Sequence, residues 1–324
     1  MIVLAAAMPA AAAGAQTLKL ASPLPEGTEW NNALLRMADE WREITGGRVR
    51  VRIYPGAIAG NEADMVRKMR FGQIDAGVFS AFGLKAMVPE TFVFTLPGLL
   101  GSEEELDYAL EHFTGRFDER FREEGFEMGA WSKTGWAYLY GPEPISAPED
   151  LKRHKLLVDN TDTDMSMVFK ALGFNVVPAG INEITVSLQS GLADTFYAPP
   201  VAAAAFQWFA LAPNMLDFRL TPVLGGLVLS ERAWQRIPAE YHEELRASME
   251  RMASDFYAES VRLNDEALAV MEQYGLHHVP VSVEEEREWT EVMTAGHRLM
   301  VGDGKIIPSE VYDDFLSMLE DARN

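Results

Sequence analysis

The stretch APEDLKRHKLLVDNTDTDMSMVFKALGFNVVPAGINEITVSLQSGLADTFYAPP, residues 147–200, alternates short apolar runs with short helical patterns. The spacing of apolar residues predicts a helix over 163–172 that ends at Gly173, and a second helix that Asn182 caps and that runs to Gln189. Three apolar runs, before, between and after these helices, predict strands at 155–158, 175–177 and 193–197. This alternation favours a parallel sheet built from βαβ units, which places ligands beyond the carboxyl ends of its strands.

The sequence on both sides of this stretch continues the α/β pattern. Strands are predicted at 17–21, 49–54, 75–79, 128–131, 136–140, 221–229 and 279–281. Helices are predicted after a Thr28 cap, at 61–71, 103–113, 116–124, 284–300 and 308–319. The longest helix is predicted over 239–274, which contains neither glycine nor proline until its end and would extend about 50 Å.

The length of 324 residues exceeds what a single hydrophobic core usually supports, so two lobes are expected. We assign residues 16–140 and 222–255 to lobe I, and residues 141–221 and 256–324 to lobe II. The two lobes are interleaved because the chain crosses between them more than once.

The N-terminal residues 1–15 have the character of a signal peptide remnant. Residues 2–13 form an alanine-rich apolar run, and Ala13-Gly14-Ala15 fits a small-residue cleavage signature. The positively charged start of a signal peptide is missing from this run, so either the start is truncated or the true initiator lies upstream. A buried N-terminal helix is the alternative, because the run is shorter than the roughly 20 residues that span a bilayer. The signal-peptide interpretation predicts an exported protein that is soluble after cleavage.

The composition excludes several classes of function. A net charge of −21 and a pI of about 4.7 argue against binding to nucleic acid or to anionic lipid, both of which require clustered cations. The chain has no cysteine, which excludes disulfides and thiolate metal sites.

The sequence contains no recognisable catalytic or metal-binding motif. It lacks a G-x-S-x-G nucleophile elbow and a glycine-rich phosphate loop. Asn160, Asp162 and Asp164 are spaced like the first ligands of a calcium loop, but Met165 stands where that loop needs glycine and Ala171 where it needs glutamate. We therefore interpret these acids as helix-capping residues and expect no enzyme activity, no cofactor and no metal.

Four segments, in the same order, resemble the DctP-like solute receptors of tripartite ATP-independent periplasmic (TRAP) transporters. They are YPGAIAGNEADMVRKMRFGQIDAG (54–77), FTLPGLLGSEEE (94–105), PEDLKRHKLLV (148–158) and KALGFNVVPAGINEITVSLQSGLADTFYAPP (170–200). The resemblance implies a two-lobed α/β periplasmic binding protein fold, in which a long helix spans both lobes and a ligand binds between them.

Three positions depart from the pattern of this family. The main carboxylate-binding arginine of the family falls at Leu157, a second common arginine at Ala137, and a common asparagine at Ala198. Leucine and alanine cannot make the paired, charge-assisted hydrogen bonds by which arginine holds a carboxylate. A small organic acid is therefore not the expected ligand.

Aromatic residues are concentrated near the matched segments, which suggests a cleft that binds by burying apolar surface. We predict a largely apolar ligand, either lipid-like or aromatic. The predicted binding residues are Phe79, Phe82, Trp136, Leu157, Ile181, Tyr197, Ala198 and Trp208. The resemblance also implies TRAP membrane permease subunits as partners and, in some relatives with a hydrophobic cleft, a tetratricopeptide-repeat protein.

Two alternatives stay open from the sequence. In the first, the receptor binds a small organic acid through non-standard cations, namely Lys133, Lys155 or Arg67. In the second, the protein is a solute-free sensor or assembly module that acts through protein contacts.

Overall fold

The computed structural model describes residues 15–323. The predicted signal peptide remnant therefore lies outside the described residues, apart from Ala15. Over the described range, none of the helices combines the length and the apolar character needed to cross a membrane.

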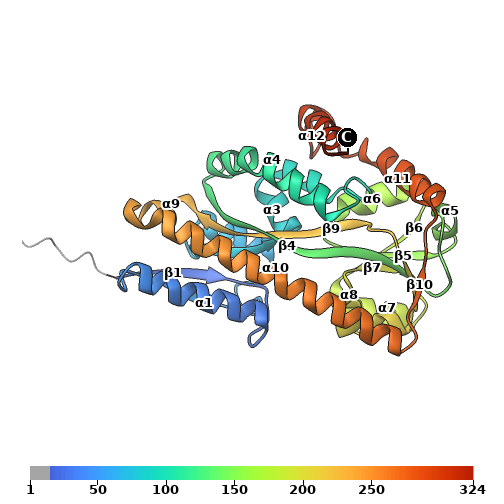
Figure 1. The fold of residues 1–324 in the computed structure, drawn as a ribbon, viewed down its shortest axis with the longest axis horizontal. Helices are drawn as coiled ribbons and strands as arrows, with labels where there is room; N and C mark the ends of the chain where they lie inside the picture. The colour runs from blue at the N-terminus through green and yellow to red at the C-terminus, as the bar shows by residue number, and fades with distance from the viewer. Residues whose placement is uncertain (1–14, 324) are drawn as a thin grey trace, which may run out of the picture.

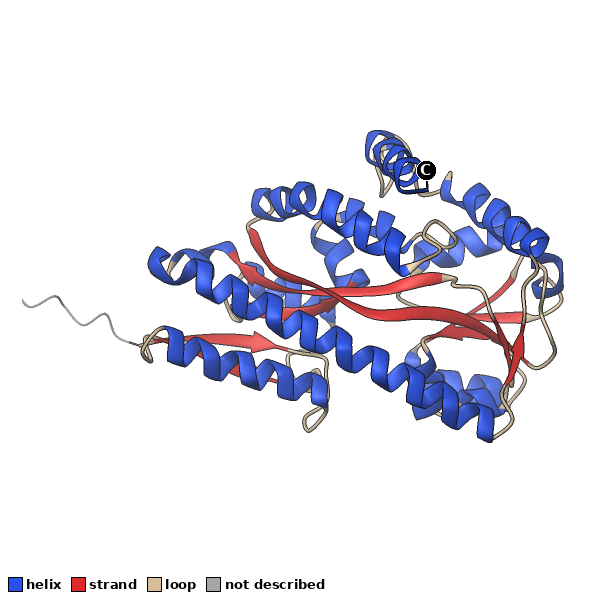
Figure 2. Ribbon diagram, in the orientation of Figure 1, coloured by secondary structure: helices blue, strands red, loops and turns tan. Residues whose placement is uncertain are grey.

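A large mixed sheet forms the centre of the molecule, with strands in the order β10-β8-β4-β9-β3-β1-β2 and with β7 added on β4 (Figures 1 and 2). Its strands are β1 (Gln16–Ala21), β2 (Val49–Tyr54), β3 (Ala76–Ser80), β4 (Phe126–Gly141), β7 (Phe196–Ala198), β8 (Asn214–Leu216), β9 (Thr221–Ser230) and β10 (His277–Val279). Parallel pairs form between β1 and β2, β1 and β3, and β8 and β10. All pairs that include β4 or β9 are antiparallel, which makes this central sheet mixed.

Strand β4 is continuous, whereas the sequence predicts two separate strands. It pairs with β9 from Phe126 to Ala137, and its last residues pair with β7 and β8. Two bulges interrupt the pairing, at Gly129 and at Thr134. Each bulge places an extra residue in β4 and breaks the alternation of apolar residues, although the hydrogen-bonded strand continues through it. The strand consequently runs from one half of the molecule into the other.

The predicted long helix is confirmed as α10 (His242–Gln273), which follows a short 3₁₀ turn at Ala239–Tyr241. Its 32 residues extend about 48 Å. Figure 1 shows α10 running along the molecule beside α1 (Glu29–Ile44), β4 and α8 (Pro200–Ala205), and residues of α10 contact all three elements. The helix therefore joins elements of both halves.

Helix α4 (Glu103–Glu123) is one helix, not the two predicted from the sequence. Its buried face carries Leu106, Ala109, Phe113, Phe117 and Phe121 at helical spacing. Burial of these side chains outweighs the cost of about 1 kcal/mol for a glycine, here Gly115, inside a helix.

The segment that decides the fold forms a small parallel sheet of β5 (Lys155–Asp159) and β6 (Asn175–Ala179), connected by α6 (Thr163–Ala171). The predicted βαβ unit is thus confirmed. Asn182 does not cap the next helix, because residues Ile181–Glu183 form a 3₁₀ turn and α7 (Ile184–Gln189) begins after Glu183. The N–H of Gly180 instead donates to Glu183 Oε2 at 2.9 Å, so the glutamate satisfies the start of this turn.

The remaining elements lie around these sheets. They are α2 (Glu62–Arg70), α3 (Ala81–Met87), a 3₁₀ segment at Pro89–Thr95, α5 (Pro148–Leu151), a 3₁₀ turn at Trp208–Ala210, α9 (Glu231–Gln235), α11 (Val283–His297) and α12 (Ser309–Arg323). Phe315 of α12 packs against Phe94 and Phe113, at ring-centroid distances of 5.6 and 4.9 Å. The C-terminal helix is therefore anchored in the same hydrophobic core as α4.

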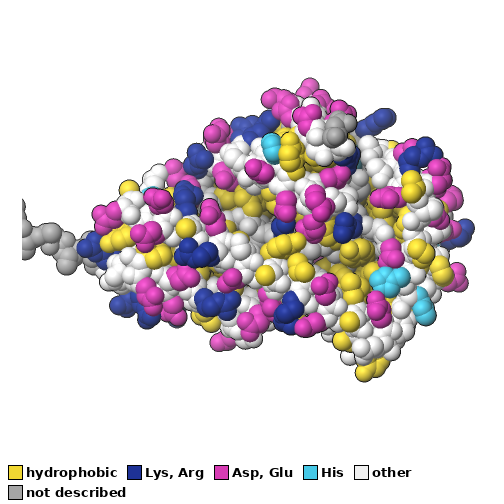
Figure 3. All heavy atoms as spheres, in the orientation of Figure 1, with side chains coloured by type: hydrophobic (Ala, Val, Ile, Leu, Met, Phe, Trp, Pro, Cys, Tyr) yellow, Lys and Arg dark blue, Asp and Glu magenta, His cyan; other side chains and the backbone are white. Residues whose placement is uncertain are grey.

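Acidic side chains are spread over the visible face of the molecule with lysines and arginines between them (Figure 3). The net charge of −21 is therefore not concentrated in one part of that face.

Candidate ligand-binding site

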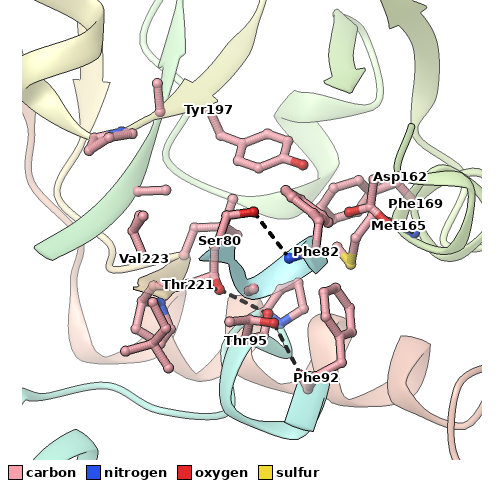
Figure 4. Close-up of a pocket in the computed structure, with 18 residues that line it drawn as sticks. Ser80, Phe82, Phe92, Thr95, Asp162, Met165, Phe169, Tyr197, Thr221 and Val223 are labelled. Atoms are coloured by element: carbon pink, nitrogen blue, oxygen red, sulfur yellow. Dashed lines mark hydrogen bonds between the residues drawn. The ribbon is translucent and has the colours of Figure 1, made fainter. Parts of the chain in front are cut away.

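A cavity of about 170 Å³ lies between α3, the start of β9, α6 and the end of β7 (Figure 4). Its walls are formed by Ser80, Ala81, Phe82, Phe92, Thr95, Pro97, Ala137, Asp162, Met165, Phe169, Tyr197, Ala198, Pro199, Leu220, Thr221, Pro222, Val223 and Leu224. Most of these residues are apolar, and four of them are aromatic. Among residues 15–323, no lysine, arginine or histidine contributes to this lining.

Three hydroxyl groups in the lining already donate hydrogen bonds within the protein. Ser80 Oγ donates to Glu62 Oε2 at 2.8 Å, Thr95 Oγ1 donates to the carbonyl of Phe92 at 3.1 Å, and Thr221 Oγ1 donates to the carbonyl of Thr95 at 2.9 Å. Figure 4 shows the bonds of Thr95 and Thr221 side by side on one wall. These interactions fix the wall and leave the cavity predominantly apolar.

Asp162 is the acidic residue of the lining and is only 1% exposed. It is the N-cap of α6, and its Oδ1 accepts a hydrogen bond from the backbone N–H of Met165 at 3.2 Å. Its Oδ2 is buried and has no hydrogen-bond partner. Burial raises the pKa of the Asp162 carboxyl, and the nearby Lys85 opposes this rise.

Lys85 of α3 lies beside the cavity and is paired with two acids of the opposite wall. Its Nζ is 3.4 Å from Asp162 Oδ1 and 2.9 Å from Asp164 Oδ2. It also lies 4.4 Å from the centroid of the Phe92 ring. One positive and two negative groups thus form this cluster, which leaves a formal charge of −1 when both acids are ionised.

Tyr197 faces Asp162 across the cavity (Figure 4). Its ring packs edge-on against Phe169, with 5.9 Å between the centroids. Burial raises the pKa of Tyr197, and the charges of Asp162 and Asp159 add to the effect. The phenol therefore stays neutral throughout the physiological range of pH.

The structure brings three of the eight predicted binding residues to this cavity, namely Phe82, Tyr197 and Ala198. Four others are buried outside its lining: Phe79, Trp136, Leu157 and Trp208. Ile181, the last, is 54% exposed on the 3₁₀ turn before α7.

The indole N–H groups of the two buried tryptophans have partners away from the cavity. Trp136 Nε1 donates to Glu103 Oε1 at 2.5 Å, and Trp208 Nε1 donates to Thr185 Oγ1 at 2.9 Å. A buried indole N–H needs a hydrogen-bond acceptor. The sequence pattern does not show whether that acceptor belongs to the protein or to a ligand.

Two of the three positions at which the resemblance predicts the loss of a polar family residue line the cavity, namely Ala137 and Ala198. Leu157, the third, packs in the hydrophobic cluster that contains Ala198. All three positions therefore carry apolar side chains in the cavity wall or in the hydrophobic cluster that adjoins it.

The three cations proposed as alternative carboxylate anchors all lie outside the lining. Lys133 is paired with Glu103 and Asp107, Lys155 Nζ donates to the carbonyl of Gly191 at 2.9 Å, and Arg67 contacts Asp64 at 2.6 Å. Each is thus held by a local partner.

Several lining residues were not identified from the sequence, above all Phe92, Asp162 and the run from Leu220 to Leu224. Asp162 was interpreted only as a helix cap, which accounts for one of its two oxygens. The run 220–224 follows an apolar strand pattern, which carries no information about the ligand. Within residues 15–323, no cluster of acidic, histidine or cysteine side chains is arranged to hold a metal ion.

Comparisons with known proteins agree with this fold. Residues 20–302 match the family described as "Bacterial extracellular solute-binding protein, family 7". A solute-binding protein of Roseobacter denitrificans is 29% identical over 196 residues, which cover 58% of this chain and 59% of the relative. The sialic acid-binding periplasmic protein SiaP of Vibrio cholerae is 20% identical over 260 residues, which cover 78% of this chain and 79% of the relative. The chain thus spans less than two thirds of the first of these two relatives.

Solved structures share the whole architecture. A TRAP periplasmic solute binding protein from Rhodobacter sphaeroides superposes with a TM-score of 0.83 at 21% identity and covers 94% of this chain and 99% of its own. A second, from Xanthobacter autotrophicus with bound β-D-galacturonate, has a TM-score of 0.79 at 18% identity, with 94% and 99% coverage. The expected two-lobed α/β fold is therefore confirmed.

Proposed function

The chain belongs to the bacterial extracellular solute-binding proteins of family 7, and from this premise we propose that it is the receptor of a TRAP transporter for a largely apolar ligand. Members of this family bind solutes for transport and are not enzymes. The observation that carries the proposal is the cavity itself, which is lined mainly by apolar and aromatic side chains and lacks a cation among residues 15–323.

The apolar lining favours affinity through burial of surface. Each Å² of apolar surface that leaves water contributes roughly 25 cal/mol. The aromatic rings of Phe82, Phe92 and Phe169 provide part of the apolar surface that a ligand would contact. A uronate, such as the galacturonate bound by one structural relative, carries a carboxylate and several hydroxyls. Burying that carboxylate beside Asp162 without a free cation would cost several kcal/mol.

Release of bound molecules from the purified protein tests this proposal. We expect native mass spectrometry followed by extraction to identify an apolar molecule. We expect Val223→Trp to lose it, because Val223 lines the cavity and tryptophan would fill the space. Val283→Trp is the matched control, since Val283 lies 86% exposed at the start of α11.

Titration of the ligand-free protein with D-glucuronate is the opposing measurement. We expect no binding in the millimolar range that calorimetry detects. Binding of glucuronate by the wild-type protein, abolished by Val223→Trp and retained by Val283→Trp, would contradict an apolar ligand and support an organic-acid receptor. Retention of the extracted molecule by Val223→Trp would show that another part of the protein holds it.

The proposed partners and location follow from the family. We propose a periplasmic receptor that delivers its ligand to TRAP permease subunits, which predicts that uptake by the reconstituted permease requires this protein. A tetratricopeptide-repeat partner stays a prediction from the resemblance.

The assignment of residues 16–140 and 222–255 to lobe I, and of 141–221 and 256–324 to lobe II, also stays a proposal. Limited proteolysis with and without ligand tests that boundary.

A further inference from the structure

The second carboxylate oxygen of Asp162 is the feature of the cavity that the fold itself does not explain. Capping α6 uses only Oδ1, and a serine or threonine at this position would cap the helix equally well. Oδ2 is buried and has no hydrogen-bond partner within the protein, and Asp162 is one of the residues that line the cavity. A buried acceptor without a partner destabilises the folded protein, and more so when it is charged. Such a group is therefore expected to have a function.

Lys85 makes no hydrogen bond with this oxygen. Its closest acidic atom is Asp164 Oδ2, at 2.9 Å, and its contact with Asp162, at 3.4 Å, is to Oδ1. The contact of Lys85 with Asp162 thus leaves Oδ2 without a hydrogen bond. With two acids to one lysine, the wall presents negative charge to the cavity.

The aromatic residues around Asp162 also favour a positively charged ligand. Phe82, Phe92, Phe169 and Tyr197 all line the cavity. The faces of aromatic rings attract cations, and Lys85 already makes such a contact with Phe92 at 4.4 Å. A carboxylate beside aromatic rings is the combination that recognises an organic ammonium group.

We propose that Asp162 Oδ2 is the polar anchor of the site and accepts a hydrogen bond from the ammonium group of an otherwise apolar amine. This inference rests on the proposed function and specifies its ligand class. An uncharged hydroxyl in the same place would make the hydrogen bond without the charge attraction and would bind more weakly. A carboxylate would be repelled, so the charge selectivity is opposite to that of a uronate receptor.

Three probes with a common phenyl body test the anchor, namely 2-phenylethylamine, 2-phenylethanol and 3-phenylpropionate. Calorimetric titration at pH 7 of the full-length protein, stripped of ligand by unfolding and refolding, gives their affinities. We expect the amine to bind at least about tenfold more tightly than the propionate, and the alcohol to lie between them.

The variant Asp162→Asn removes the charge and keeps a side chain that caps helices equally well. We expect it to weaken binding of the amine roughly tenfold and to abolish the preference over the propionate. Asp164→Asn is the matched control, because it removes the same charge from the same cluster at a residue outside the lining. It should weaken the preference less than Asp162→Asn does, because the unpaired oxygen of Asp162 stays in place. Thermal unfolding checks that both variants fold.

The results that would contradict the Asp162 anchor differ from those that would contradict an apolar ligand site. Equal affinity for all three probes, lost in Val223→Trp, would overturn the anchor and leave the apolar site intact. An unchanged preference in Asp162→Asn, or an equal loss in Asp164→Asn, would also overturn it, since selectivity would then not depend on Oδ2. A wild-type protein that fails to bind the amine would contradict the proposed ligand class directly.

Discussion

Lys85 and Asp162 lie 77 residues apart in the sequence, yet Lys85 Nζ approaches Asp162 Oδ1 to 3.4 Å across the wall of the cavity. The contact connects α3, in the segment expected to form lobe I, with the N-cap of α6, in the segment expected to form lobe II. Because Asp162 is almost fully buried and the Lys85 side chain is 16% exposed, this pair is shielded from solvent far more than a surface ion pair.

Replacing Lys85 by methionine should destabilise the protein. Asp162 and Asp164 would then lack the cation that pairs with both of them, and we expect a loss of about 2–3 kcal/mol, between the values for exposed and for buried pairs. Urea unfolding at pH 7 measures it. The double variant Lys85→Met/Asp162→Asn should recover at least half of the loss, because it removes the unpaired buried charge.

Lys152→Met is the control for this experiment. Lys152 pairs with Glu149 at 2.7 Å on the exposed surface, so its replacement should cost less than about 0.5 kcal/mol. Equal losses in the two lysine variants would show that the Lys85 pair has no special energetic role.

His297 should make the stability of the protein sensitive to mild acid. It is fully buried, its Nε2–H donates to the carbonyl of Pro97 at 2.8 Å, and its Nδ1 accepts from the Tyr312 hydroxyl at 2.8 Å. Burial lowers the pKa of His297 from 6.5 to about 4. The unfolded chain therefore binds a proton below pH 6.5 that the folded chain does not bind until about pH 4.

Stability should accordingly fall as the pH falls through this window. The contribution of His297 is about 3 kcal/mol, since each unit of pKa shift corresponds to about 1.4 kcal/mol. We expect the difference in unfolding free energy between wild type and His297→Gln to change by this amount between pH 7 and pH 4. Tyr312→Phe should keep the pH dependence of the wild type. A difference that is constant with pH would show that His297 titrates normally in the folded protein.

Asn264 should be important for the attachment of α10 to its neighbours. Its Oδ1 accepts from the backbone N–H of Val201 at 3.0 Å, and its Nδ2 donates to the carbonyl of Thr134 at 2.9 Å. Asn264→Leu leaves both backbone groups without this partner, so we expect a loss of about 2–3 kcal/mol in urea unfolding. Asn32→Leu, which removes an exposed hydrogen bond to Glu29, should change stability by less than about 0.5 kcal/mol. Comparable losses would refute a special role for Asn264.

The glycine at the second bulge of β4 should be difficult to replace. Gly135 has a φ of +109°, and a Cβ built there would lie 2.9 Å from Asn264 Nδ2. We expect Gly135→Ala to cost about 2–3 kcal/mol, from backbone strain and from displacement of Asn264. Gly125→Ala is the control, because Gly125 also has a positive φ, of +79°, but has open space around its Cβ position. Its cost should be about 1 kcal/mol from the backbone alone. Thermal unfolding of both variants tests the comparison, and equal costs would exclude a contribution from crowding.

Local patterns in the sequence predicted most of the helices and strands. The cap at Thr28, the start of α2 near Asn61 and the long pattern that became α10 depend on residues within a few positions of each other. The same patterns failed where tertiary contacts decide the outcome. The two bulges in β4 interrupt the alternation while the strand continues, because β9 supplies hydrogen-bond partners along its length.

The sequence by itself determined the family, the α/β architecture and the apolar character of two cavity positions, Ala137 and Ala198, because motifs and residue types are properties of the chain. Only the tertiary structure decided that Asp162 faces the cavity with one oxygen unpaired, and that Lys85 is held by Asp162 and Asp164. Which groups are buried, and which charges meet, depends on segments that are distant in sequence and that folding brings into contact. In the sequence, Asp162 is recognisable only as a helix cap. The proposal that it also anchors a ligand depends on its second oxygen, which the fold buries without a partner.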